Sequence, residues 1–367
     1  MKIHFRSSVF LIPVLTLTLF GQGCFGSSTS APTGPDGGVW KTSDSGTTWV
    51  NKKALVSGPK VTATGAAFSI VNMAFDPQDH NTIYLATAAH GMVFSLDGGD
   101  SWQQAKSQDE KKNVLTSGRV NAVAVDPKNK CIVYAASGNK IYKTETCGRD
   151  WNQIFFDPRT DKSFTQLIVD WFNPTILYAG TNDGDIFRST DAGLSWQMSK
   201  RVDGISITSL GMDPRDSRLV YVGTQGDGIW KTVDGGTTWT QIKKQFGEEY
   251  TDARRVIQLV IDPVEANVIY NVSKYGIIKS LDGGETWKAL NLTSPPGTVK
   301  INSLAVDPKN NKHLIYTGVS TLQFSSDGGV SWTPKKLPTT QAGSILLFDP
   351  IDSKVIYLGT VPPPSKK

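Results

Sequence analysis

The sequence has few of the residues that metal sites and nucleophilic active sites use. Its 367 residues include three cysteines and four histidines, and His80, His90 and His313 are far apart in sequence. Neither the HExxH pattern of zinc hydrolases nor the Gly-x-Ser-x-Gly pattern of serine hydrolases occurs. These absences argue against metal-dependent and triad-type hydrolysis, and we expect neither a metal nor a cofactor.

The excess of one charge sign over the other is also small. The formal net charge is +5, and it falls to +3 (36 basic and 33 acidic residues) when Lys2 and Arg6 of the N-terminal segment are set aside. Lysine and arginine form no continuous stripe along the chain. Because nucleic-acid-binding proteins concentrate positive charge in such a stripe or patch, the sequence predicts no nucleic-acid partner.

The N-terminal segment has the pattern of a secretory signal. Lys2, His4 and Arg6 precede an apolar run from Val9 to Phe20. This run is too short to span a bilayer as a helix, and small residues follow it, as at a cleavage site. We therefore predict a signal peptide over residues 1–23.

A lipid anchor is predicted at Cys24. The sequence Phe20-Gly21-Gln22-Gly23-Cys24 resembles a bacterial lipobox, although Gln22 and the position of Leu19 depart from the usual pattern. The resemblance implies a lipidated Cys24 that holds the protein in the bacterial cell envelope, whereas plain secretion is the alternative. The small and polar residues within 24–36 predict a flexible linker. Membrane contact is expected only through the lipid.

One motif recurs along almost the whole remaining chain. Its clearest copy is GIWKTVDGGTTW, from Gly228 to Trp239, which predicts a short strand, a tight turn and the start of a second strand. Seven copies, 43 to 53 residues apart, end at Trp49, Trp102, Trp151, Trp196, Trp239, Trp287 and Trp332. A fixed period of this size is typical of solenoids and propellers.

A second motif alternates with the first. Apolar runs end in Asp-Pro at residues 77, 127, 214, 263, 308 and 350, and the variant FTQLIVDW ends at Trp171. A tyrosine in an apolar strand follows each Asp after eight residues, or after nine between Asp307 and Tyr316. One repeat therefore predicts four strands, which we name A (ending at Asp-Pro), B (around the Tyr), C (before the turn) and D (from the Trp).

The two ends of the repeat region complement each other. The first copy has strands C and D only, and the last segment, Ser344 to Thr360, has strands A and B only. Pairing these ends would cover edges that are otherwise open. The sequence thus predicts an all-β, seven-bladed propeller of four-stranded antiparallel blades over residues 37–360, closed by this joint, with a tail at 361–367.

The first motif, Ser/Thr-x-Asp-x-Gly-x-Ser/Thr-Trp, resembles the Asp box, or BNR repeat, of sialidases, xyloglucanases, sortilin-type receptors and photosystem II assembly factors. The Asp-Pro and Tyr-x-Gly-Thr motifs look most like the xyloglucanase and sortilin-type versions. A carboxylate that recurs once per blade at one position accepts N–H groups of its own turn, so we interpret it as structural. The predicted structural residues are Asp44, Asp97, Asp191, Asp234, Asp282 and Asp327.

One copy, TETCGRDW, lacks the Asp and has Thr146 followed by Cys147 in its place. A hairpin turning at Gly138-Asn139 would put Cys131 one step from Cys147. In an exported protein, a remaining pair of cysteines favours a disulfide. We expect the Cys131–Cys147 bond to replace the missing carboxylate contacts; two unrelated buried thiols are the alternative.

Strand direction puts the B–C turns and the D–A loops at one end of the blades. Such loops carry binding residues in many folds, although any single member is most often an ordinary solvated side chain. Lys300 is a further cation of the D–A loops, and Arg254-Arg255 suits carboxylate or sulfate recognition. The candidate binding residues are His90, Arg119, Arg254, Arg255, Lys274 and Tyr275.

The sequence departs in specific ways from the catalytic families that share the Asp box. The sequence has no Arg-Ile-Pro motif, and seven blades is one more than the sialidase family has. Xyloglucanases hold two carboxylates in a cleft between two propellers, and one propeller is predicted here. Asp183, Asp185 and Asp227 are the weak catalytic candidates. We expect a monomeric, non-catalytic module that binds a protein or polysaccharide, with a xyloglucanase-like glycoside hydrolase or its glycan-binding remnant as the alternative.

Overall fold

The computed structural model describes Met1 and residues 36–57, 60–107 and 109–363. The predicted signal peptide after Met1, the lipidated Cys24 and nearly all of the linker lie outside the described residues. One compact unit comprises Pro35–Lys367. In the described part of the chain, no helix is both long enough and apolar enough to cross a membrane.

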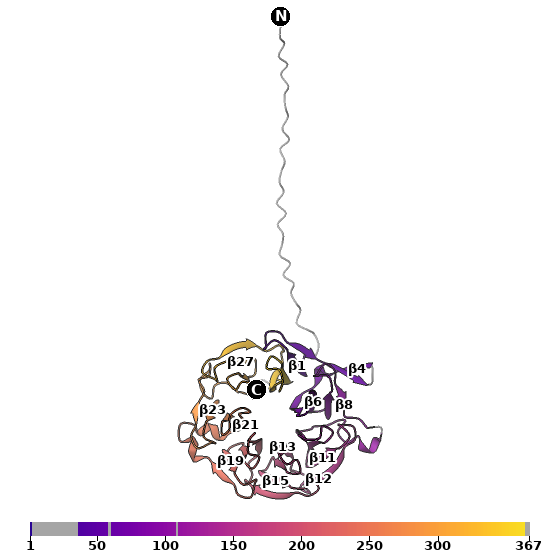
Figure 1. The fold of residues 1–367 in the computed structure, drawn as a ribbon, viewed down its shortest axis with the longest axis vertical. Coiled ribbons are helices and arrows are strands. Elements are labelled where there is room, and N and C mark those ends of the chain that lie inside the picture. Colours follow the sequence, from indigo (N-terminus) through magenta and orange to yellow (C-terminus); the bar gives the residue numbers. More distant parts are fainter. Residues whose placement is uncertain (2–35, 58–59, 108, 364–367) are drawn as a thin grey trace. The chain divides into compact units, whose positions relative to one another are not determined.

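The predicted propeller is confirmed. The described residues form seven four-stranded antiparallel sheets arranged as blades around a ring (Figure 1). Within each blade the strands follow one another in the order A to D, and strand A lies innermost, since the A strands of neighbouring blades contact each other around the ring. Short apolar runs separated by glycine- and Asp-rich turns therefore produce the antiparallel meander that the repeat predicts.

The strands of the blades, in the order A to D, have the following bounds. Blade 1 contains β5 (Ile70–Asp76), β6 (Asp79–Thr87), β7 (Met92–Ser95) and β8 (Gln103–Gln104). Blade 2 contains β9 (Ala122–Val125), β10 (Val133–Ser137), β11 (Lys140–Thr144) and β12 (Asn152–Phe156). Blade 3 contains β13 (Phe164–Val169), β14 (Leu177–Thr181), β15 (Asp185–Ser189) and β16 (Gln197–Arg201). Blade 4 contains β17 (Ile207–Met212), β18 (Val220–Thr224), β19 (Ile229–Thr232) and β20 (Thr240–Ile242).

The remaining blades follow the same order. Blade 5 contains β21 (Val256–Ile261), β22 (Ile269–Ser273), β23 (Ile277–Ser280) and β24 (Lys288–Ala289). Blade 6 contains β25 (Ser303–Val306), β26 (Leu314–Thr317), β27 (Thr321–Ser325) and β28 (Thr333–Lys336). Blade 7 contains β29 (Ala342–Phe348), β30 (Ile356–Val361), β1 (Val39–Thr42) and β2 (Val50–Lys52).

Blade 7 closes the ring as the sequence predicts. Strand β1 pairs with β30 in antiparallel register, with Trp40 opposite Leu358 and Lys41 opposite Tyr357. The two ends of the repeat region thus share one sheet, and neither β1 nor β30 is left as an open edge.

The structure adds elements between the blades. Strands β3 (Ala54–Ser57) and β4 (Lys60–Thr64) form a separate two-stranded hairpin between blades 7 and 1. Four short 3₁₀ helices lie in connections, namely η1 (Gly65–Ala67), η2 (Glu110–Lys112), η3 (Lys244–Phe246) and η4 (Thr251–Arg254).

The hydrophobic core is divided among the interfaces of neighbouring blades. One cluster, for example, joins Tyr270 and Val272 of blade 5 to Leu304 and Val306 of blade 6, all of them buried. Each blade therefore buries both faces of its sheet against its neighbours, which explains why strands A and B are almost entirely apolar.

The Asp-Pro turns stabilise the end of each inner strand. In blade 2, the Asp126 carboxylate accepts the backbone N–H groups of Lys128 and Asn129 at 2.7 and 3.0 Å. The same contacts recur at Asp213, and Asp126 and Asp213 are both buried. These turns and the Asp boxes lie at one end of the blades, which we name the box face. The B–C turns and D–A loops form the opposite loop face.

Candidate functional site

A cavity of about 540 Å³ opens at the centre of the loop face. Residues of β5, β13, β17 and β21 line it, together with Arg119 and Asn121 just before β9. Five blades thus contribute their innermost strands or the residues that lead into them, and Lys300, just before β25, adds a sixth blade. The remaining lining residues come from B–C turns and D–A loops, such as Gln225 and Lys300.

A repeated β-bulge shapes this lining. The register of strands A and B shifts near the start of the inner strand in blades 1, 3, 4, 5 and 7. A bulge leaves one residue without a partner and redirects its side chain. Four of the five bulged residues, Val71, Thr165, Thr208 and Ile257, line the cavity, whereas Ser344 of blade 7 does not.

Four cations surround the cavity, and we name them the basic mouth: Arg119, Arg255, Lys274 and Lys300. No lining residue among those described is acidic. All four are exposed residues. The other polar lining residues, including Asn72, Gln166 and Gln225, are neutral.

The cations of the basic mouth are largely unpaired. Lys274 Nζ lies 3.1 Å from the Asp252 carboxylate, and Arg119 Nε donates to Asn121 Oδ1 at 2.7 Å. Arg255 and Lys300 form no ion pair or side-chain hydrogen bond with any described residue. This leaves the arrangement able to bind an anion, because guanidinium and ammonium groups donate to carboxylate, sulfate or phosphate oxygens.

Three of the six predicted binding residues therefore come together at the mouth, and three do not. Arg254 lies in η4, where its Nε is buried and has no described hydrogen-bond partner. The ring of His90 packs 5.0 Å from that of Phe68. Tyr275 contacts Tyr250 edge-on and lines a separate cavity of about 490 Å³ beside the loop at 289–296.

The three weak catalytic candidates form ion pairs. Asp185 is fully buried and accepts from Arg201 Nε at 2.6 Å and Arg159 Nη2 at 2.6 Å. Burial alone would raise the pKa of Asp185, but the hydrogen bonds from the two arginines outweigh it and lower the pKa. Asp185 thus stays ionised, whereas a glycosidase general acid needs a raised pKa.

The other two carboxylates are also engaged. Asp183 lies 3.1 Å from Lys162 Nζ and 3.5 Å from Arg159 Nη1. Asp227 lies 2.7 Å from Lys243 Nζ and accepts the indole N–H of Trp230 at 3.3 Å. These ion pairs hold the loops of blades 3 and 4 in place.

The Asp-box carboxylates are satisfied within their own turns. Asp234 accepts the Thr232 hydroxyl at 2.8 Å, and the backbone N–H and the hydroxyl of Thr238 at 2.8 and 2.6 Å. The hydroxyl and N–H of Thr238 lower the pKa of Asp234 to about 2. Equivalent contacts, and a lowered pKa, occur at the other predicted positions: Asp44, Asp97, Asp191, Asp282 and Asp327.

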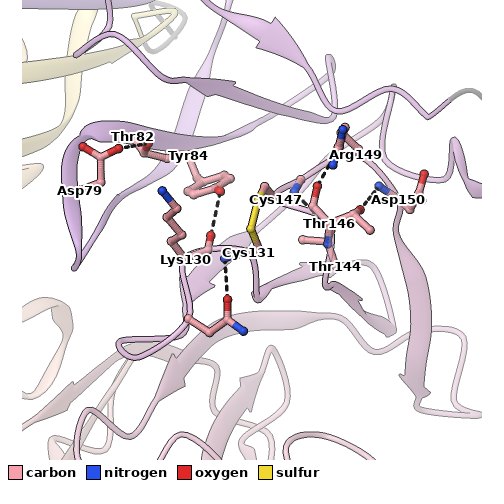
Figure 2. Close-up of a disulfide and its surroundings, with 12 residues drawn as sticks. Asp79, Thr82, Tyr84, Lys130, Cys131, Thr144, Thr146, Cys147, Arg149 and Asp150 are labelled. Atoms are coloured by element: carbon pink, nitrogen blue, oxygen red, sulfur yellow. Dashed lines mark hydrogen bonds between the residues drawn. A yellow bond between two sulfur atoms is a disulfide. The ribbon is translucent and has the colours of Figure 1, made fainter.

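The broken box contains a disulfide between Cys131 and Cys147 (Figure 2). The Thr146 hydroxyl occupies the carboxylate position and accepts the Asp150 N–H at 2.8 Å. It accepts one backbone N–H in this turn, where Asp44 accepts two through one oxygen. Cys131 lies just before β10, and the disulfide connects it to Cys147 in this turn. A covalent bond is thus present in the one described box that lacks the carboxylate hydrogen bonds.

Models of two protein families match different parts of the chain. The photosynthesis system II assembly factor YCF48 model matches residues 33–210, and the sortilin (neurotensin receptor 3) model matches residues 227–343. Each model covers less than half of the sequence, and together they extend over most of the propeller.

One curated relative matches part of the chain in sequence. Xyloglucanase Xgh74A of Acetivibrio thermocellus is 32% identical over an alignment covering 35% of this chain and 20% of the xyloglucanase. The chain thus spans about a fifth of this relative's length.

Two solved structures illustrate the likeness. A structure of YCF48 bound to a D1 peptide superposes with a TM-score of 0.61 at 17% identity, covering 82% of this chain and 94% of that one. The GH74 enzyme of Niastella koreensis also gives a TM-score of 0.61, at 19% identity, covering 80% of this chain and 51% of the enzyme. At these identities the likeness shows the propeller fold alone.

Proposed function

We propose that this chain, an Asp-box β-propeller related to YCF48, sortilin-type and GH74 xyloglucanase propellers, is a non-catalytic module that binds an anionic segment of a protein partner. The basic mouth is the observation that carries the proposal. Four cations surround a cavity of about 540 Å³ whose described lining has no acidic residue. Such a charge arrangement steers and orients an anionic ligand.

The side chains that line the site favour a protein segment over a small anion. The cavity is lined by neutral side chains such as Asn72, Gln166 and Gln225 in addition to the cations. Amide side chains can hydrogen-bond to a peptide backbone, while the cations pair with acidic side chains or a terminal carboxylate. A structure of the similar YCF48 contains a bound D1 peptide, which supports peptide binding by this kind of propeller.

The proposed location is the bacterial cell envelope. The signal pattern of residues 1–23 and the lipobox-like sequence ending at Cys24 support export and lipid anchoring. The linker at 24–36 would let an anchored propeller present its mouth to a partner. Release of the protein without a lipid is the alternative outcome of the same signal.

Glycan binding or hydrolysis is the second candidate, supported by the match to a xyloglucanase. A hydrolase would need two carboxyl groups in the roles of acid and base or nucleophile. Asp183, Asp185 and Asp227 are engaged with cations instead. This arrangement favours the binding function.

Site-specific photo-crosslinking in cells of the source organism tests the proposal. A benzophenone amino acid would replace Gln225, which is exposed at the mouth, or Lys312, which is exposed on the box face. We expect an adduct with an envelope protein from position 225 and none from position 312.

Each other outcome contradicts the proposal. Equal adducts from both positions would show contact without a preference for the mouth. Adducts only from position 312 would place the partner on the box face. Failure to form any protein adduct, or capture of polysaccharide at position 225, would favour the second candidate.

A further inference from the structure

A tyrosine of strand B bridges neighbouring blades through the Asp-box turn at three of the seven joints. The Tyr357, Tyr221 and Tyr134 hydroxyls donate to backbone carbonyls of the next blade's Asp-box turn, at Gly98, Gly283 and Ala192. The distances are 2.8, 3.4 and 3.2 Å, and the three tyrosines are buried. The aromatic ring thus fills the space between two blades, and its hydroxyl fastens them.

In blade 6 the tyrosine itself is absent from the bridging position. In blades 2, 4 and 7, the bridging tyrosine lies opposite a lysine of strand C, as Tyr357 does with Lys41. In blade 6 that position holds Ile315, which lies opposite Phe324. Tyr316 is one position further along, opposite Gln323, and its ring packs 4.8 Å from that of Trp332.

The reason is one additional residue between Asp307 and Tyr316 compared with the other repeats. Because successive side chains of a strand point to opposite faces, a shift by one residue moves the tyrosine to the other side of the sheet. Ile315 then faces blade 7 and is too short to reach its Asp-box turn.

A cavity of about 340 Å³ lies at this joint. Its floor consists of apolar side chains that are buried, including Leu314, Ile315, Phe348 and Ile356. Phe324 forms a wall and contacts the Gly46 turn of blade 7. This volume and this apolar lining lie in the range of small-molecule sites, which are about 300–1,000 Å³.

The rim of the cavity is polar and contains Lys335, which has no ion-pair partner among the described residues. Lys335 Nζ lies 4.4 Å from the centre of the Phe324 ring and donates to the Gly46 and Ser45 carbonyls at 3.1 and 3.4 Å. An ammonium group has three N–H donors, so one donor remains for a ligand. His313 also lines the cavity, but its Nδ1 faces Asp307 Oδ2 at 3.1 Å.

We propose that the joint between blades 6 and 7 is a second binding site, for a small carboxylate with an aromatic or branched aliphatic body. The body takes the place that a tyrosine ring fills at other joints, against Ile315, Phe324 and Phe348. The carboxylate pairs with Lys335. This site is on the box face side and does not depend on the basic mouth.

Binding at this place would also stabilise the closed ring. The cavity is lined by β26–β28 of blade 6 and, in blade 7, by Phe348 of β29, Ile356 of β30 and the turn that follows β1. A ligand that touches both blades binds the folded state only, and it therefore raises the melting temperature with the logarithm of 1 + L/Kd, where L is the free ligand concentration.

The test uses 3-phenylpropionate and its uncharged amide as probes of the full-length protein. We expect saturable one-to-one binding by calorimetry, with a Kd of about 1 mM, typical of a ligand of this size, and a melting temperature that rises with the logarithm of ligand concentration above Kd. The amide should bind several-fold more weakly. Absence of saturable calorimetric binding of the carboxylate, or of any rise in melting temperature with it, would overturn the proposal.

Two variants locate the site. Ile315→Tyr fills the cavity and should weaken 3-phenylpropionate binding by at least about tenfold, the effect of losing roughly 1.4 kcal/mol. Ile315→Val keeps the cavity open and should still bind. Lys335→Met should bind the carboxylate and the amide equally, and this result does not require the tyrosine variant to fold. Unchanged binding in Ile315→Tyr, or an unchanged carboxylate preference in Lys335→Met, would contradict the site.

Discussion

At the residue scale, aspartate has two structural roles and its position decides between them. In the Asp box, the carboxylate closes the turn that follows strand C on the box face, as Asp234 does with Thr238. In the Asp-Pro turn, it caps the end of strand A, as Asp126 does with Lys128. Both roles use backbone N–H groups within four residues in sequence. The Asp-box role was predicted from the motif, whereas the capping role of the Asp-Pro carboxylate is a finding of the structure.

The cysteine pair was also predictable, because it coincides with the loss of one Asp. The basic mouth was predictable only in part. Arg119, Arg255 and Lys274 were identified as loop cations, but nothing in the sequence distinguished them from Arg254, which lies with its Nε buried in η4. The neighbouring residues Arg254 and Arg255 differ in whether they line the cavity. The loops contain no repeat motif from which this difference could be predicted.

The disulfide leads to a stability prediction. Replacing Cys131 and Cys147 by Ser should lower the free energy of unfolding by about 3 kcal/mol, because the bond closes a loop of about 16 residues in the unfolded chain. Chemical denaturation of the purified, oxidised wild type and of the purified Cys131→Ser/Cys147→Ser variant measures the difference.

A restored box provides the control for the disulfide prediction. In the Cys→Ser background, the changes Thr146→Asp and Asp150→Ser recreate the motif of the other copies, and they should recover part of the lost stability. Equal stability of the Cys→Ser variant and the wild type would refute the structural role of the bond.

At the element scale, the closure of the ring follows from complementary half-blades, and β1 pairs with β30 as the sequence predicts. Other features were not predictable. The β3–β4 hairpin lies between the first box and the first Asp-Pro run, where no motif repeats; it is held by backbone hydrogen bonds such as Val56 N–H to the Trp102 carbonyl at 2.8 Å. The bulges of the inner strands depend on how neighbouring blades pack, which a single strand's sequence does not reveal.

The bridging tyrosines provide a prediction at this scale. Tyr357→Phe should lower the free energy of unfolding by about 1 kcal/mol, because it removes a buried hydrogen bond and leaves the Gly98 carbonyl without this donor. Tyr270 provides a matched control, since its hydroxyl is buried without a described hydrogen-bond partner.

Tyr270→Phe should therefore be neutral or stabilising, because a buried unsatisfied hydroxyl is removed. Urea denaturation of the two variants beside the wild type measures both values. A loss at Tyr270 equal to the loss at Tyr357 would show that the ring, and not the hydroxyl, fastens the blades.

At the scale of the whole molecule, the propeller separates its structural and binding groups between two faces. The box face carries the repeated carboxylates, which are engaged in turns. The loop face carries the basic mouth, where Arg255 and Lys300 have no described ion-pair partner. Repetition explains why the fold was predictable in detail, and the lack of repetition in the loops explains why the ligand was not.

The central claim is that the basic mouth recognises an anionic protein segment through its charge. The most direct measurement is fluorescence anisotropy of a labelled peptide of alternating Glu and Gly, titrated with three forms of the protein. These are the wild type, the mouth variant Arg255→Ser/Lys300→Ser, and the box-face variant Lys312→Ser/Lys354→Ser. Both variants lose two positive charges from exposed positions.

We predict that the mouth variant binds the peptide about tenfold more weakly than the wild type, since each exposed ion pair contributes about 0.5–1 kcal/mol. The box-face variant should retain wild-type affinity, and added salt should weaken wild-type binding. Equal losses in both variants, or no binding by the wild type, would contradict the assignment of the basic mouth as the recognition site.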